Sequence, residues 1–284
     1  SNSSAASDVY KRQKSLLGRV YLTKGDFLNA ESKLKEVTTM GYQLLANYED
    51  LFDYTKSEHH SEYIFDIEYQ SGIGEGSTFT TAFFPNFSEM NEFFNITGAG
   101  QEYNNPTQEL ISLFVPGDTR KEVTVGVPGG FYDADSVFHA LPTSTNQTYT
   151  KKYFDSSPVR ADSKANWKVI RYADVLLMYA EALNENGKPQ QAIPFLNQVR
   201  TRAGLEGYPN TMSQTETRDA IVLERRLELS FEGVRWFDLV RTGKAYEVMK
   251  DKGMAPYMTV FPIPLSQVQI INDPTIFPQN PGYD

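Results

Sequence analysis

The stretch of sequence that decides the fold is NWKVIRYADVLLMYAEALNENGKPQQAIPFLNQVRTRA, residues 166–203. It predicts two helices folded back on each other. In the first helix the apolar residues recur at helical spacing and share one face: Tyr172, Val175, Leu176, Tyr179 and Leu183. Gly187 ends this helix, and Pro189 suits the first turn of the next, where a missing N–H costs nothing. The second helix has its own stripe, Ala192, Leu196, Val199 and Ala203, so the hairpin predicts a stacked neighbour that covers both stripes.

A second helical pair near the N-terminus repeats this pattern at a constant offset. Within LLGRVYLTKGDFLNAESKLKEV, residues 16–37, four positions align with the later hairpin: Gly25 with Gly187, Ala30 with Ala192, Leu34 with Leu196 and Val37 with Val199. Leu17-Gly18-x-x-Tyr21 followed by Ala30-x-x-x-Leu34 fits the tetratricopeptide pattern with one conservative change. We therefore expect the pairs at about 14–40 and 170–205 to pack together, with a charged helix at 217–231 completing the layer.

The other segments predict a strand, a loop-rich region and an extended end. SEYIFDIEY, residues 61–69, alternates in the manner of a half-buried strand. Residues 41–165 are rich in Gly, Pro, Asn, Ser and Thr, and binding groups are expected on such loops when a rigid scaffold holds them. Residues 244–284 are rich in proline and predict an extended wrap over the helices.

This ordered set of segments resembles the SusD/RagB family of outer-membrane nutrient-binding lipoproteins from Bacteroidetes. The matching pieces span nearly the whole chain: 61–69, 170–183, 196–205, 224–241, 261–264 and 279–283. The most specific block joins RYAD (171–174) and AEALN (180–184) to ERR (224–226) and GVRWFDL (233–239). The resemblance implies a mainly α, SusD-like fold of tetratricopeptide-like hairpins, with a loop-rich insertion containing short strands and an extended Pro-rich C-terminal wrap.

The resemblance also implies a function. Family members are non-catalytic, and they bind oligosaccharide or polysaccharide on the outward face of the outer membrane for delivery to a SusC-like TonB-dependent transporter. Two alternatives remain open. Some members imply peptide capture by the same type of complex, and a tetratricopeptide adaptor would grip a partner protein. The adaptor is disfavoured because a concave repeat groove needs consecutive repeats, whereas this chain spaces its two repeats far apart.

Family members extend further at the N-terminus and carry a lipid anchor there. We therefore expect residues 14–284 to be an N-terminally truncated domain with its ligand-binding loops at about 41–165. The opening SNSSAASDVYKRQ, residues 1–13, is small and polar and is interpreted as a non-native tail. Truncation would leave an apolar face on the first helix uncovered, and its expected members are Leu16, Leu17, Val20 and Tyr21.

Composition excludes several classes of protein. A net charge of −9 with a pI near 5.0 argues against nucleic acid, which needs clustered Lys and Arg. The absence of cysteine removes thiol catalysis, disulfides and Cys-based zinc sites. The sequence also has no stretch of eighteen apolar residues, so it predicts no transmembrane helix. Neither a cofactor nor a metal is expected.

Three motifs suggest chemistry but favour structural interpretations. Gly72-x-Gly74-x-Gly76 follows a strand, but the sequence after it offers no helix to hold a pyrophosphate, so it predicts a flexible loop. His59 and His60 are interpreted as an exposed pair in a turn. Glycosidases use paired carboxylates, but Glu224, Glu228 and Glu232 lie one turn apart among arginines and predict structural ion pairs.

Aromatic side chains are the remaining candidates for a binding site. A sugar ring has an apolar C–H face that can stack on an exposed Trp, Tyr or Phe, while nearby polar groups bind its hydroxyls. Trp167 and Trp236 lie in scaffold motifs and are interpreted as packing residues. The expected ligand-binding candidates are therefore aromatic residues of the loop-rich region: Phe83, Phe84, Phe87, Tyr103, Tyr132 and Tyr149.

Overall fold

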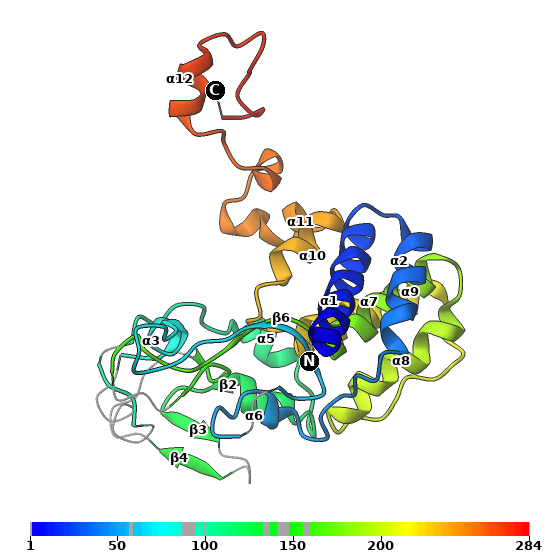
Figure 1. Ribbon diagram of the computed structural model, residues 1–284, viewed down its shortest axis with the longest axis vertical. Helices are drawn as coiled ribbons and strands as arrows, with labels where there is room; N and C mark the ends of the chain where they lie inside the picture. Colours follow the sequence, from blue (N-terminus) through cyan, green and yellow to red (C-terminus); the bar gives the residue numbers. More distant parts are fainter. Residues whose placement is uncertain are drawn as a thin grey trace. The chain divides into compact units, whose positions relative to one another are not determined.

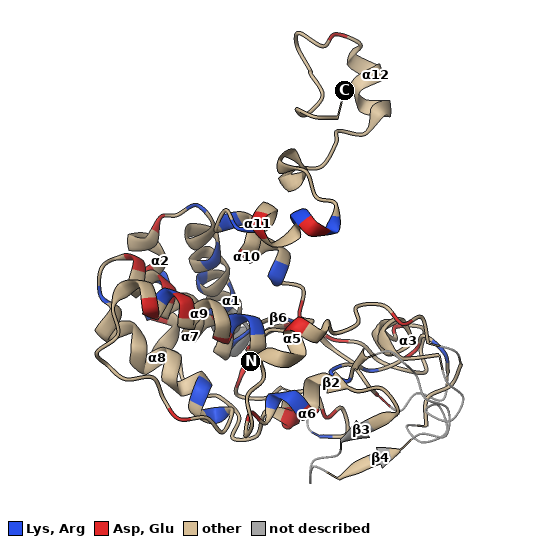
Figure 2. Cartoon of the chain, turned by 180° about the vertical axis from the view of Figure 1, so that it is seen from behind, with Lys and Arg blue, Asp and Glu red and all other residues tan. Residues whose placement is uncertain are grey.

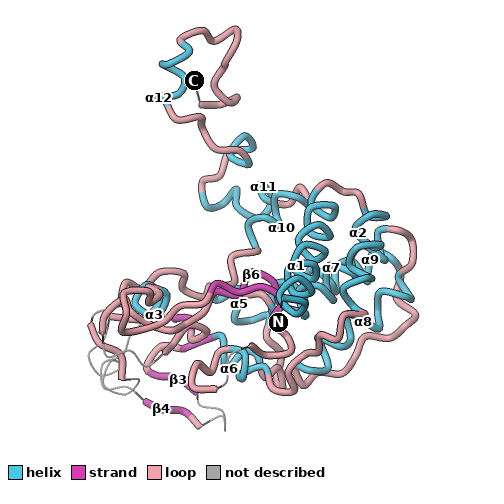
Figure 3. Tube along the Cα trace, in the orientation of Figure 1, coloured by secondary structure: helices cyan, strands magenta, loops and turns pink. Residues whose placement is uncertain are grey.

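The computed structural model describes residues 2–56, 59–86, 95–98, 100–132, 137–140, 148–155 and 159–283. The chain divides into two compact units, Ser1–Gly233 and Val234–Asp284. The first unit places a layer of helices beside a loop-rich region with short strands (Figure 1 and Figure 3). Its main helices are α1 (Asn2–Thr23), α2 (Phe27–Thr38), α7 (Tyr172–Glu185), α8 (Pro189–Arg202) and α9 (Gln214–Glu228). The mainly α, tetratricopeptide-like fold predicted from the sequence is confirmed.

The two helical pairs pack against each other, as predicted. One continuous core runs through α1, α2, α7, α8 and α9, and it includes Leu34 and Leu196, which occupy equivalent positions in the repeat. Small residues allow the close approach of the backbones: a Cβ on Gly18 of α1 would lie 2.6 Å from Cδ2 of Leu34 in α2. Ala30, Ala180 and Ala192 are fully buried. The α9 helix completes the layer and begins with a capping box at Ser213 and Glu216.

Two boundaries differ from the sequence-based expectation. Residues 167–171 form the strand β6 (Trp167–Arg171), so the first helix of the hairpin begins only at Tyr172. At the other end α1 begins at Asn2, so the segment expected to be a tail unlike the following helix is helical itself. Residues 2–22 contain no proline, and their one glycine is Gly18, so nothing in the local sequence interrupts the helix. Leu16, Leu17 and Val20 are exposed, Val20 by 52%, and Tyr21 is half-buried, as expected for that face.

The loop-rich region is organised by three short antiparallel pairs. The strand β1 (Tyr63–Ile67) pairs with β6, and Tyr63 lies opposite Arg171. The other pairs are β2 (Val125–Gly126) with β5 (Tyr149–Thr150), and β3 (Gly130–Tyr132) with β4 (Phe138–Ala140). Short helical elements also occur in this region: η1 (Tyr48–Leu51) before β1, and α3 (Phe79–Phe83), α5 (Gln108–Leu113) and α6 (Arg120–Thr124) between β1 and β2.

The second unit is not uniformly extended, although its proline content suggested this. It contains α10 (Arg235–Arg241), α11 (Ala245–Met249), η2 (Lys250–Lys252), η3 (Pro256–Thr259) and α12 (Leu265–Ile271). Two of the motif segments bind each other here. The side-chain amide of Gln279 donates to the backbone oxygen of Ile263 (2.8 Å) and its oxygen accepts from the Ile263 N–H (2.7 Å). The Tyr283 hydroxyl donates to the backbone oxygen of Val260 (2.9 Å). In the described part of the chain, no helix is long and apolar enough to cross a membrane.

Candidate functional site

The glycine-rich loop and the histidine pair have structural roles. Gly72 and Gly74 adopt positive φ angles, and the Gly72 N–H donates to the Asp162 carboxylate (2.8 Å). A one-turn helix, α3, does follow this loop, contrary to the expectation, because Phe79 and Phe83 stack on consecutive turns. His59 is exposed, whereas His60 is half-buried and packs edge-on against Tyr63. Within the described ranges, no group of three potential ligands could hold a metal ion.

The three carboxylates of α9 and the turn after it form ion pairs, which confirms the structural interpretation. Their partners are different from those expected, since they come from distant segments rather than from the neighbouring turn. Glu224 accepts from Arg120 (2.8 Å) and Arg200 (2.7 Å). The expected helical neighbours bind elsewhere: Arg225 pairs with Asp174 (2.8 Å) and Arg226 with Glu109.

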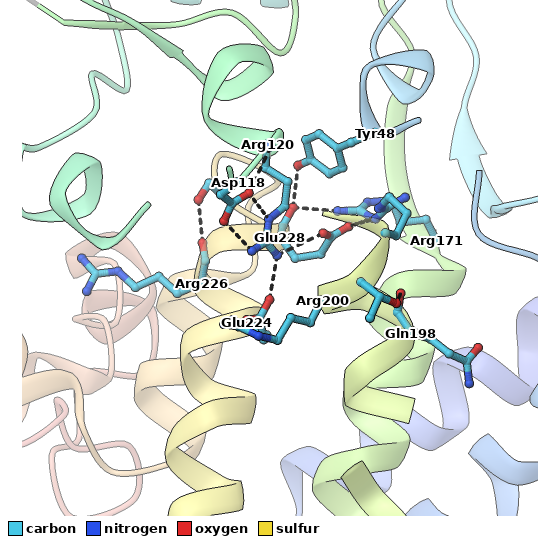
Figure 4. Close-up of polar contacts among 12 residues, drawn as sticks. Tyr48, Asp118, Arg120, Arg171, Gln198, Arg200, Glu224, Arg226 and Glu228 are labelled. Atoms are coloured by element: carbon cyan, nitrogen blue, oxygen red, sulfur yellow. Dashed lines mark hydrogen bonds and ion pairs between the residues drawn. The ribbon is translucent and has the colours of Figure 1, made fainter. Parts of the chain in front are cut away.

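Glu228 is the centre of this buried network (Figure 4). Its carboxylate pairs with Arg171 of β6 and Arg202 of α8, and it lies 3.5 Å from Arg120 at the start of α6. Its backbone oxygen accepts from the Tyr48 hydroxyl of η1 (2.8 Å). Among the described residues the charges of the network balance, with five acids (Glu62, Asp118, Glu224, Glu228, Glu232) and five bases (Arg120, Lys152, Arg171, Arg200, Arg202).

The network joins the helical layer to the loop-rich region. Arg171 also binds Glu62, just before β1 (2.9 Å), and Glu232 (2.7 Å), and Glu232 in turn binds Lys152, which follows β5 (2.8 Å). Figure 2 shows that acidic and basic residues are interspersed on the helices of this unit. Buried charges of this kind are tolerated only when they are paired. The loops are therefore fixed to a rigid scaffold by charge pairing.

Acid should destabilise this scaffold. Burial opposes ionisation of Glu228 and Asp174, but nearby arginines outweigh it and lower the pKa of each to about 2 from 4.5 and 3.8. A carboxyl with a lowered folded-state pKa stabilises the fold above its unfolded-state value, and this stability is lost as pH falls. We expect the free energy of unfolding in urea to decrease between about pH 4.5 and pH 2. In Glu228→Gln the decrease should be smaller, and an equal decrease would contradict the assignment to Glu228.

The six aromatic residues expected to bind ligand have different environments. Tyr103 is 59% exposed and Phe83 is half-buried, whereas Phe84 and Tyr149 are buried (0% and 2% exposed) and offer no ring face. Tyr132 lies in β3, and its side chain is outside the described part. Phe87 also lies outside the described residues.

The structure brings four of these residues together around α3. The Tyr103 N–H donates to the Ala82 oxygen (2.9 Å), so the segment that carries Tyr103 runs beside Phe83. The next residue in the chain, Phe84, packs against Phe154 (4.9 Å between ring centroids), which stacks on Tyr149 (5.9 Å, 2° between planes). We call Phe83 and Tyr103, together with Phe84, Phe154 and Tyr149, the α3 platform. Phe84 and Tyr149 are buried, Phe83 and Phe154 are half-buried, and Tyr103 is exposed.

Aromatic packing around α3 extends beyond the six residues predicted from the sequence. Phe79 and Trp167 are half-buried and lie 4.9 Å apart, and both pack against the buried ring of Tyr153. Trp167 was interpreted as a packing residue, and its stacking on Tyr153 (5.6 Å, 12°) agrees with that. The sequence signal that could have identified this extension is the four-residue spacing of Phe79 and Phe83, which places both rings on one face of a helical turn.

A cleft of about 540 Å³ lies near the network and was also missed. It is lined by segments around η1, α6, β5 and the end of α8, and Arg202 and Tyr48 connect it to the ion pairs. A second hollow of about 460 Å³ shares Thr119 and Glu122 with it. The cleft carries acceptors and donors of both charges, which suits a neutral polyhydroxylated ligand: Asn47, Glu49, Asp53, Thr119, Glu122, Lys151 and Arg202.

Together, a tetratricopeptide-like helical layer and a loop-rich region pinned to it by buried arginines define a class of helical-scaffold protein. The sequence profile of the SusD family matches residues 61–283. The chain therefore belongs to the SusD family, as the resemblance predicted.

Individual relatives agree with this assignment. SusD-like protein P2 of Formosa agariphila is 27% identical over 94% of this chain and 58% of the relative. The fold is similar to that of a laminarin-binding SusD-like protein, with a TM-score of 0.76 and 31% identity over 96% of this chain. It is also similar to a SusD superfamily protein from Parabacteroides distasonis, with a TM-score of 0.75, 28% identity and 95% of this chain covered. The chain spans 58% of P2 and 62% of each of these two structures.

Proposed function

We propose that this protein binds oligosaccharide or polysaccharide without catalysis and that the α3 platform is its stacking surface. The observation that carries the proposal is the similarity to the laminarin-binding relative over 96% of this chain. The exposed ring of Tyr103, whose backbone is hydrogen-bonded to Ala82 of α3, provides the apolar surface that a sugar face needs. The α9 carboxylates support a non-catalytic role because they are buried and held by arginines, whereas hydrolysis needs carboxylates that reach a sugar.

We further propose that the complete protein is anchored to the outer membrane by lipid, faces outward, and delivers its ligand to a SusC-like TonB-dependent transporter. Membership of the SusD family supports this role. Peptide capture by the same type of complex is the alternative ligand class. A glycan is favoured because a solved structure that is 31% identical over 96% of this chain is named for laminarin binding.

Binding should depend on Tyr103. Replacement with alanine removes the exposed ring without opening the core, so we expect the loss of about 1–3 kcal/mol of binding free energy. Isothermal titration calorimetry against laminarin-derived oligosaccharides, after an affinity-gel screen of polysaccharides, measures this effect. EDTA should not change the affinity, because stacking and hydrogen bonds carry it.

Matched variants locate the ligand. Tyr10→Ala removes a tyrosine of similar exposure (49%) from α1 and should leave the affinity unchanged. Asn47→Ala changes the cleft instead of the platform. Loss of affinity in Asn47→Ala alone would move the site from the α3 platform to the cleft. If the protein binds members of a peptide library and no polysaccharide, the ligand is a peptide and not a glycan.

A further inference from the structure

Lys168 of β6 is a buried cation without a hydrogen-bond acceptor in the described part of the protein. The residue is 5% exposed, and its Nζ atom makes no hydrogen bond there. Three aromatic rings surround this atom, with centroids at 4.8 Å (Phe52), 5.0 Å (Tyr54) and 5.3 Å (Tyr63). Ring faces stabilise an ammonium only in part, and a buried ammonium that lacks an acceptor is costly.

The rings around Lys168 are held in place by their own hydrogen bonds. The Tyr63 hydroxyl donates to the Leu51 oxygen (2.8 Å), and the Tyr54 hydroxyl donates to the Lys152 oxygen (3.0 Å). These bonds fix both rings from separate segments. The rings that surround Lys168 Nζ are therefore held in place independently of the lysine.

A cavity of about 20 Å³ adjoins Lys168, which is room for one small guest. Its lining includes three lysines (Lys56, Lys164, Lys168) and one aspartate (Asp53). The other lining residues are Tyr54, His60, Tyr63 and Asn166. The single carboxylate is already engaged, since Asp53 accepts from the Thr55 N–H (3.0 Å) and Thr55 hydroxyl (2.6 Å) and pairs with Lys56 (3.4 Å). Lys56 also pairs with Asp50, whereas Nζ of Lys168 is buried and has no acceptor among the described residues.

We propose that this cavity binds one small monovalent anion, a halide or the carboxylate of a small organic acid, with Lys168 as its principal donor. The anion supplies the acceptor that Nζ of Lys168 lacks. Burial lowers the pKa of Lys168 to about 7, and a bound anion holds the amine in its charged form. The volume admits a single small ion and excludes a sugar ring. The site is therefore distinct from the α3 platform.

Two measurements on the full chain test this proposal. In crystals grown with sodium bromide, anomalous diffraction should place bromide within hydrogen-bond distance of Lys168 Nζ. In solution the protein should broaden the chloride NMR line, and Lys168→Met, which keeps the stem but removes the charge, should abolish the broadening. Lys24→Met, at an exposed lysine, is the control and should retain it.

Competition with formate distinguishes the two kinds of anion. If formate restores the narrow chloride line, the site accepts carboxylates, and if it does not, the site is specific for halides. A water in place of bromide beside Lys168, or unchanged chloride broadening in Lys168→Met, would overturn the proposal. The bromide measurement uses the unaltered protein, so it remains decisive if the variant does not fold.

Discussion

Replacing Arg171 with methionine should lower the free energy of unfolding by about 3–5 kcal/mol, because it leaves buried carboxylates without their cation. Arg171 is 1% exposed and bonds three of them, Glu62, Glu228 and Glu232. Urea unfolding followed by far-UV circular dichroism measures the change. The effect should be large because the same guanidinium joins β6, the segment before β1 and the end of α9.

The control for this prediction is a salt bridge at the surface. Arg218 makes two hydrogen bonds of 2.7 Å to Glu185, but its side chain is 42% exposed. Exposed pairs contribute little because solvent screens them, so Arg218→Met should cost less than about 1 kcal/mol. Equal losses in the two variants would show that burial of the network does not determine its contribution.

The helical layer could be predicted because its signals are local. The apolar spacing of Tyr172–Leu183 and the offset between Leu34 and Leu196 follow from helical geometry alone. The start of α7 at Tyr172 was harder to predict from the sequence. Residues 167–171 pair with β1, about a hundred residues earlier in the chain, and that pairing overrides the helical pattern.

The partners of the α9 carboxylates could not be predicted from the sequence. Helical spacing indicated ion pairs within α9, yet Glu224 binds Arg120, which is 104 positions away. Arg120 reaches it because the loop-rich region packs on α9 through Leu110 and Phe114, which is tertiary packing. The class of interaction was therefore predictable from residue type and spacing, whereas its geometry was not.

For the candidate binding surface, the sequence predicted which loops are rich in aromatic residues but not which rings are exposed. Phe83 and Phe84 are adjacent in sequence, but one is half-buried and the other fully buried. Which ring faces outward depends on the backbone of residues 100–103, where a Cβ on Gly100 would lie 1.8 Å from the Phe84 oxygen. Such a close approach cannot be seen without coordinates. Tyr103 remains a prediction until its variant is tested.

Replacing Leu34 with alanine should cost about 2–5 kcal/mol, because the side chain is fully buried between α1, α2 and α7. Leu28→Ala, on the same helix but 71% exposed, should change stability by no more than about 0.5 kcal/mol. Both are measured by urea unfolding. A small loss at Leu34 would mean that the two helical pairs do not share one core.

The contact between Gly18 and Leu34 offers a second test, in which the effect of one substitution on stability changes sign. Alanine at Gly18 gains about 1 kcal/mol of helix propensity, but its Cβ would lie 2.6 Å from Leu34, an overpacking that costs about 1–3 kcal/mol. We therefore expect Gly18→Ala to be neutral or destabilising in the natural chain. In the Leu34→Ala background the clash is gone, and Gly18→Ala should become stabilising. This coupling is specific to a small residue facing a large one, so additive effects would contradict the matched packing of the repeat.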